Sequence, residues 1–118
     1  MQHRLISDDD ISFGRVRRRR VRVLIERGFP VEERPVRALA EILARGVLKK
    51  HGDQAAIAVM FYDDIFTPQG TLGSWDWCPN GVWGEADKTR DGDYSQHRWV
   101  LERSALMPYQ MVQQLLKR

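Results

Sequence analysis

The residues whose types could support catalysis are few and scattered along the chain. Asp63 and Asp64 are adjacent carboxylates, His97 is a titratable base, and Cys78 is the single cysteine. A nucleophilic thiolate requires an activating base beside it, and nothing in the spacing places Cys78 near His97. We therefore expect no catalytic residues and no cofactor. A small enzyme that uses Asp63, Asp64 and His97 is kept as an alternative.

The most distinctive feature of the chain is a cluster of tryptophans. Three of the four, Trp75, Trp77 and Trp83, lie within nine residues. Such rings rarely stay on a bare surface, because each carries a large apolar area. Trp75 and Trp77 would share one face of a strand, and Trp99 would pack across a neighbouring strand. We expect at least two of the four in the core, and expect Trp83, beyond a turn, to be most free to meet a partner.

A run of arginines, Arg15, Arg17–Arg20 and Arg22, stands near the amino terminus. On a strand, Arg18, Arg20 and Arg22 would share one face, where arginine forks suit phosphate groups. This pattern makes nucleic-acid binding an alternative function. The same charges could instead protect a solvated edge strand or pair with acidic loops in residues 63–93. No aromatic residues alternate with these arginines, as most single-strand binders require.

One acidic loop has part of the pattern of a calcium site. Residues 87–93 offer oxygens at positions 1, 3 and 5 and a glycine at position 6 of the loop. The twelfth position, which should be a bidentate Glu, is Arg98, and Lys88 and Arg90 reduce the negative charge. We therefore predict a polar loop and no metal site.

Length and composition indicate a small soluble domain. The 118 residues fit a single domain, with 42% hydrophobic and 30% charged residues. Neither a membrane span nor an apolar signal region is apparent, so a cytoplasmic location is expected. The net charge of +3 is divided into +6 over residues 1–50, −5 over residues 51–103 and +2 over residues 104–118. Such a division predicts a dipolar surface or opposite charges that meet.

The patterns predict the elements that must position these residues. Residues 1–10 look loosely ordered, 11–26 extended with alternating apolar residues, and 32–50 helical with an apolar stripe. Residues 55–62 are apolar on both faces, which is typical of a central strand. Further predictions are strands over 72–78 and 97–103, a turn at 79–81, a loop over 85–96 and a helix over 104–117.

These elements predict an α/β two-layer sandwich with a mixed sheet of about four strands, in the order β-α-β-β-β-α. The strand–helix–strand unit should be a parallel crossover, and later strands should add by antiparallel pairing. The last helix would present Met107 and Met111, which suit an adaptable binding face. The leading hypothesis is a small non-catalytic binding domain that forms a homodimer through that helix or an exposed strand edge. Its candidate binding residues are Trp75, Trp77, Trp83, Asp63, His97, Met107 and Met111.

The chain also resembles a family of small uncharacterised bacterial domains that often follow a lipoprotein-type signal. The resemblance covers about residues 10–102 and lies in residues 62–64, 71–73, 79–83 and 93–97, together with the expected strand and helix. From the sequence we expect the chain to differ from that family in lacking the signal and in adding a helix after Ser104. The resemblance implies the fold alone and supplies no functional residues.

Overall fold

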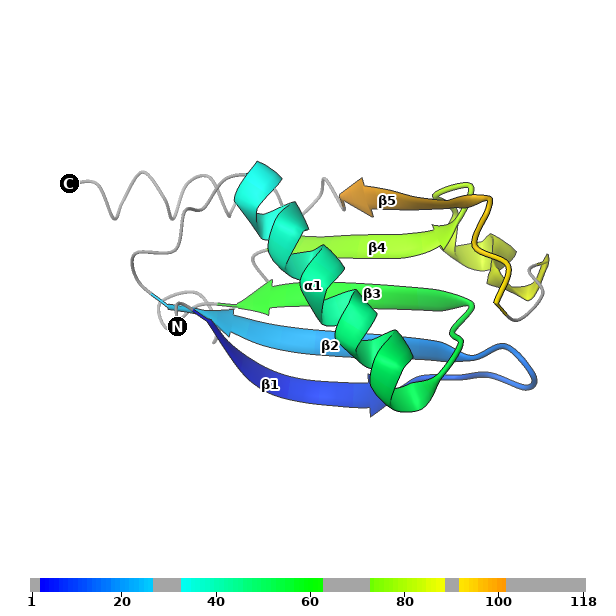
Figure 1. Ribbon diagram of the computed structural model, residues 1–118, viewed down its shortest axis with the longest axis horizontal. Coiled ribbons are helices and arrows are strands. Elements are labelled where there is room, and N and C mark those ends of the chain that lie inside the picture. Colours follow the sequence, from blue (N-terminus) through cyan, green and yellow to red (C-terminus); the bar gives the residue numbers. More distant parts are fainter. Residues whose placement is uncertain (1–2, 27–32, 63–72, 89–91, 102–118) are drawn as a thin grey trace.

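The computed structural model describes residues 3–26, 33–62, 73–88 and 92–101. It is a mixed α+β fold with an open five-stranded sheet in the order β1-β2-β3-β4-β5. One long helix, α1, runs diagonally across a single face of this sheet (Figure 1). The predicted count of about four strands is therefore one too low within the described residues.

The additional strand is β1 (His3–Asp10), which pairs antiparallel with β2 (Arg18–Ile25). The prediction of a loosely ordered segment over residues 1–10 is thus wrong. Aspartates disfavour strands by propensity, but here they face arginines across the strand pair, and such opposite-charge pairs stabilise a sheet. The hairpin turns at Gly14, whose φ of 62° suits the first position of a two-residue loop between Phe13 and Val16.

The predicted crossover is confirmed. From β2 the chain enters α1 (Glu33–His51) and returns as β3 (Ala56–Tyr62), parallel to β2. Three basic residues close the last turn of α1, where the helix dipole favours positive charge. The helix ends at Gly52, whose φ of 83° is readily adopted only by glycine.

The core lies between α1 and the sheet. From β2 and β3 it takes alternate residues, since these share one face of a strand. The buried strand residues are Val21, Val23, Ile25, Ile57, Val59 and Phe61. The predicted helix stripe meets them, with Val36, Leu39 and Val47 buried and Leu43 partly buried. On the other face of β3, Ala56 is buried, whereas Ala58, Met60 and Tyr62 are only half-buried.

The second half of the sheet is built by antiparallel pairing, as predicted. Strand β4 (Gly73–Pro79) pairs with β3, and β5 (His97–Leu101) pairs with β4. The predicted turn after β4 is present, with Asn80 and Gly81 at φ values of 56° and 73°. A Cβ at Gly81 would lie 2.6 Å from Val100 Cγ2, so this turn accommodates only glycine without a shift.

Residues 85–88 were expected to be part of a loop and instead belong to a 3-10 helix, η2 (Trp83–Lys88). It packs on the sheet face opposite α1 through Ala86 and Trp83, which contact a cluster that contains Cys78 and Ala56. None of the helices in the described chain is long and apolar enough to cross a membrane. The helix predicted over 104–117 lies outside the described residues.

Candidate functional site

Four rings from β4, β5 and the segment before β5 gather on the α1 side of the sheet. The Trp77 ring is central, with centroids 4.8 Å from Tyr94, 4.3 Å from His97 and 6.4 Å from Trp99. The strand register explains this arrangement, because Trp77 lies opposite Trp99 and Pro79 lies opposite His97. Residues two apart on a strand point to the same face. We call these four residues the aromatic cluster.

A groove of about 360 Å³ lies between the aromatic cluster and α1. The strands line one wall with two indole rings. The helix lines the other wall with residues spaced by three and four positions, which lie on one helix face. The lining residues are Trp77, Trp99, Glu41, Ala44, Arg45 and Leu48. The lining is therefore of mixed polarity, with two indole rings facing a helix wall that carries two charged residues.

Hydrogen bonds from outside the strands hold the aromatic cluster in place. The Tyr94 hydroxyl donates to Asp53 Oδ1 at 2.6 Å, and His97 Nε2 lies 2.8 Å from the carbonyl oxygen of Ala55. Because a carbonyl oxygen only accepts, Nε2 carries the proton in this contact. The His97 side chain is buried, and its Nδ1 has no hydrogen-bond partner within the described chain. These contacts fix the rings that support Trp77.

Two charged residues stand at the rim of the groove. The carboxylate of Glu41 accepts a hydrogen bond from Arg37 Nε at 3.2 Å and lies 4.0 Å from Arg45 Nη2. The Arg45 side chain is 77% exposed, so this long ion pair leaves its guanidinium accessible to a ligand. The groove thus combines flat apolar walls with one accessible positive charge.

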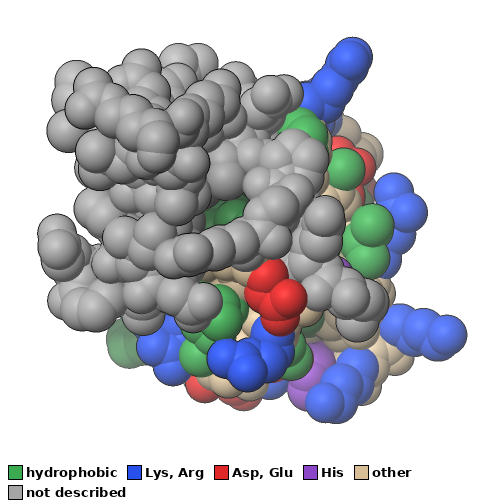
Figure 2. Space-filling model, turned by 90° about the vertical axis from the view of Figure 1, so that its left-hand side faces the viewer, with side chains coloured by type: hydrophobic (Ala, Val, Ile, Leu, Met, Phe, Trp, Pro, Cys, Tyr) green, Lys and Arg blue, Asp and Glu red, His purple; other side chains and the backbone are tan. Residues whose placement is uncertain are grey.

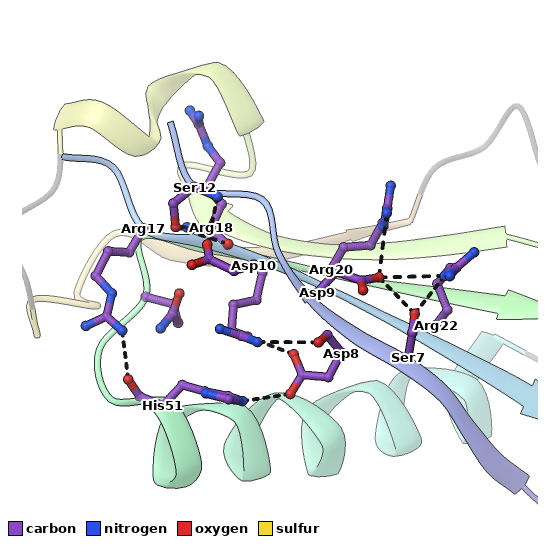
Figure 3. A network of polar contacts seen from close by, with 12 residues as sticks. Ser7, Asp8, Asp9, Asp10, Ser12, Arg17, Arg18, Arg20, Arg22 and His51 are labelled. Atoms are coloured by element: carbon purple, nitrogen blue, oxygen red, sulfur yellow. Dashed lines mark hydrogen bonds and ion pairs between the residues drawn. The ribbon is translucent and has the colours of Figure 1, made fainter. Parts of the chain in front are cut away.

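Basic side chains also occupy the opposite face of the sheet. Arg18, Arg20 and Arg22 share this face, as predicted, and in Figure 3 the side chains of Arg20 and Arg22 extend away from α1. Their described acidic partner is Asp9 of β1, at 3.6 Å from Arg20 and 3.8 Å from Arg22. The alternative of pairing with acidic loops in residues 63–93 stays a prediction, since residues 63–72 and 89–91 lie outside the described residues. Positive side chains also project around the end of the molecule seen in Figure 2.

A second charged group is structural and lies on the α1 side. Asp8 joins β1 to its neighbours, through Arg19 Nε at 2.7 Å and His51 Nε2 at 2.9 Å (Figure 3). Burial raises the pKa of Asp8, but the hydrogen bonds from Arg19 and His51 outweigh burial and leave the pKa below its usual value. We call Asp8, Arg19 and His51 the Asp8 clamp, since it ties the hairpin to the end of α1.

The tryptophans that the sequence singled out occupy different environments. Trp75 and Trp77 share the α1 face, but Trp75 is only 4% exposed and belongs to the core, whereas Trp77 lines the groove. Trp83 is partly buried on the opposite face, where the Arg18 guanidinium lies 5.7 Å from its ring centroid. The sequence separated Trp83 from the other two tryptophans but did not distinguish Trp75 from Trp77.

The residues considered for catalysis are not brought together in the described chain. Cys78 is buried on the face opposite α1, whereas His97 lies on the α1 face beside Trp77. Burial and the nearby charge of Asp76 raise the pKa of the Cys78 thiol to about 11, which disfavours the reactive thiolate. Asp63, Asp64, Met107 and Met111 lie outside the described residues.

The described residues contain no group of three or more His, Cys, Asp or Glu side chains arranged to hold a metal ion. No protein-family model, curated protein or solved structure matches the chain significantly. The resemblance to lipoprotein-associated domains thus stays a prediction. A proposal about function therefore rests on the geometry of the groove.

Sequence reasoning missed the helix wall of the groove and two members of the aromatic cluster as site residues. Glu41, Arg45 and Leu48 flank the predicted apolar stripe, so they read as ordinary solvent-facing positions. Tyr94 belonged to a predicted loop, and Trp99 was assigned to cross-strand packing. The spacing of Glu41, Arg45 and Leu48 shows that they share a helix face. Only the position of α1 across the sheet, which the structure supplies, shows that this face lies opposite β4 and β5.

Proposed function

We propose that this protein is a non-catalytic binding domain whose ligand site is the groove between α1 and the β4–β5 strands. The observation that carries the proposal is a concave site lined by Trp77 and Trp99, with Arg45 and Glu41 at its rim. A volume of about 360 Å³ lies within the range of pockets that bind small molecules.

The chemistry of the walls suits a ligand that joins a flat ring to a carboxylate. The Trp77 and Trp99 rings are inclined by 35°, so together they offer a shallow aromatic floor for one more ring. The exposed guanidinium of Arg45 suits a carboxylate, which it can bind through two parallel hydrogen bonds. A free aromatic acid and the carboxyl-terminal aromatic residue of a peptide both carry this chemistry.

Indole N–H signals in a proton–nitrogen correlation spectrum test the proposal. The chain has four tryptophans, so four such signals report on core and groove separately. The probes are indole-3-carboxylate, a short peptide ending in a free tryptophan, and the same peptide with an amidated carboxyl terminus. We expect the first two to shift Trp77 and Trp99 while Trp75 stays fixed, and the amidated peptide to bind about 5-fold more weakly.

The peptide and the free acid together distinguish the two sources of the ligand. Tighter binding of the peptide favours a protein partner, and tighter binding of the acid favours a metabolite. The Arg45→Ala variant should lose the preference for the free carboxylate, whereas Ile42→Ala, an exposed position on α1, should keep it. If no probe shifts Trp77 or Trp99, or if all four indoles shift together, the groove is not a specific site.

The edge of β5 supports a second proposal, the pairing of two copies of the chain. Within the described residues no strand pairs with its outer side, and Val100 of this strand is 40% exposed. By contrast, the β1 edge carries a register shift between Leu5 and Ser7 and three aspartates, which are features that discourage pairing. Light scattering should give a dimer whose association weakens in Val100→Lys, and a monomer at high concentration would refute this proposal.

A further inference from the structure

The sheet face opposite α1 carries a second, independent surface, which consists of Arg18, Arg20 and Arg22 with the aromatic residues Trp83 and Phe13 at the same end of the sheet. We infer that this surface binds single-stranded nucleic acid, with the phosphate backbone along β2 and bases stacked on the aromatic rings. The inference does not depend on the groove, because the two lie on opposite faces of the sheet.

The spacing of the arginines suits a linear polyanion. Alternate residues of a strand lie about 6.6 Å apart and point to the same face, so the three guanidinium groups form a regular row. Each can bind a phosphate with two parallel hydrogen bonds. The Nε atoms of Arg18 and Arg20 are buried and have no hydrogen-bond partner in the described chain. A small rotation that exposes them to a phosphate oxygen relieves the cost of these unsatisfied donors.

The row keeps a positive charge despite its neighbours. One carboxylate, Asp9, faces both Arg20 and Arg22, and both distances exceed that of a hydrogen bond. The Arg20 and Arg22 side chains are 40% and 38% exposed, so these ion pairs are weak and a phosphate can compete for both. Ser7 Oγ accepts a hydrogen bond from Arg22 Nε at 2.7 Å, which orients that fork.

The structure supplies the aromatic rings that the linear sequence seemed to lack. Trp83 comes from η2 and stacks with the Arg18 guanidinium, a pairing that combines charge with a ring surface. Phe13 stands at the tip of the β1–β2 hairpin and is 81% exposed, next to the exposed Arg15 and near Arg17. Such an exposed ring is unusual for a hydrophobic residue, and base stacking accounts for it. Figure 1 places the hairpin tip and η2 at the same end of the sheet.

Fluorescence anisotropy of the whole chain with labelled oligothymidine and oligouridine tests the inference. If three arginines contact phosphates, the logarithm of the binding constant should fall with the logarithm of salt concentration with a slope of about −2. The double variant R20A/R22A should bind at least about 10-fold more weakly at low salt, and its slope should be flatter by about one. The matched control K49A/K50A removes two exposed charges at the end of α1 and should change binding by less than about 2-fold.

Two further measurements separate nucleic acid from polyanions in general. Phe13→Ala should weaken binding of the oligonucleotide about 10-fold, because a stacked base is lost, and should not affect binding of polyphosphate. Equal binding of polyphosphate and oligonucleotide, with no effect of Phe13→Ala, would overturn the inference. Equal losses of oligonucleotide affinity in R20A/R22A and K49A/K50A would also overturn it. So would a binding constant of the wild-type chain that does not change with salt concentration. Groove variants such as Arg45→Ala should leave this binding unchanged, so failure of one proposal is distinguishable from failure of the other.

Discussion

The β1–β2 half and the β4–β5 half of one sheet are held in place by different interactions. In the first half, the carboxylates of Asp8 and Asp9 bind arginines of β2, and Asp8 also binds His51 of α1. In the second half, the rings of the aromatic cluster pack on one another. Hydrogen bonds also hold two of them, from Tyr94 to the Asp53 carboxylate and from His97 to the carbonyl oxygen of Ala55. Ion pairs respond to pH and salt, whereas packed rings do not.

In the second half the same residues contribute to stability and to the proposed binding, whereas in the first half different residues do so. The rings of the second half serve both, because Trp77 supports the cluster and lines the groove. In the first half, the charged residues on the α1 face stabilise the fold, and those on the opposite face are proposed to bind. The Asp8 clamp fixes the hairpin on the α1 side, whereas Arg20 and Arg22 on the other side are only weakly paired.

The largest effect is expected in the aromatic half. Trp77→Ala removes the ring that contacts Tyr94, His97 and Trp99, and should lower the free energy of unfolding by about 3 kcal/mol. The matched control is Phe13→Ala, which removes an exposed ring from the charged half and should change stability by less than about 0.5 kcal/mol. Urea denaturation monitored by circular dichroism measures both. Similar losses in the two variants would remove the distinction between the halves.

The charged half should show a smaller, pH-dependent effect at the Asp8 clamp. Asp8→Asn breaks two charge-assisted hydrogen bonds in a partly buried site and should cost about 2 kcal/mol at about pH 7. Because the folded-state pKa of Asp8 is lowered, its stabilisation is complete above the unfolded-state pKa of about 3.9 and is lost as pH falls through the folded value. The difference between variant and wild type should therefore disappear in acid.

Urea denaturation at several pH values measures this difference. Gly81→Ala, which places a methyl group against Val100, is the internal comparison, since its cost is steric and should not change with pH over the same interval. A constant cost of Asp8→Asn down to acid pH would show that the carboxylate charge is not what holds the hairpin to α1.

The turn after β4 gives a third, intermediate test. Gly81→Ala places a methyl group against Val100 of β5 at a φ of 73°, and should cost about 1.5 kcal/mol. Gly14→Ala introduces the same strain of a side chain at positive φ, here 62°, but its added Cβ has no atom within 4 Å. It should therefore lower the free energy of unfolding by only about 1 kcal/mol. Thermal melts of the two variants measure the part of the cost that is due to the contact with β5. A larger loss for Gly14→Ala would contradict this contact.

The elements of the core could be predicted from the sequence because their periodicity is strong. The stripe of α1 and the alternation in β2 fixed both elements and their parallel crossover to β3. The hairpin was missed for a local reason, since Gly14 in the middle of an extended run was not recognised as a turn. The strand β1 was missed because three consecutive aspartates look disordered until the opposite strand supplies arginines.

The candidate site was less accessible to sequence reasoning than the fold. Trp77 was identified by residue type alone, but the groove also needs Arg45 and Leu48, more than 25 residues away along the chain. The pairing of Trp83 with Arg18 spans an even longer separation. Residue types indicate which side chains are favoured in the core or in ion pairs, whereas the topology determines which of them come into contact.

The smallest change in stability should accompany a clear change in binding. Asp9→Asn removes a half-buried carboxylate whose ion pairs with Arg20 and Arg22 are long. The asparagine amide oxygen can still accept the hydrogen bond that Ser7 Oγ donates to Asp9 at 2.8 Å, so the free energy of unfolding should change by only about 0.5 kcal/mol. The same substitution frees both guanidinium groups for phosphate, so affinity for the single-stranded oligonucleotide should rise about 3-fold. Asp8→Asn should show the reverse pattern, with a large loss of stability and little gain in binding at temperatures where it stays folded. If Asp9→Asn weakens binding instead, Asp9 positions the arginines rather than competing with phosphate, and the two faces of the hairpin are not independent.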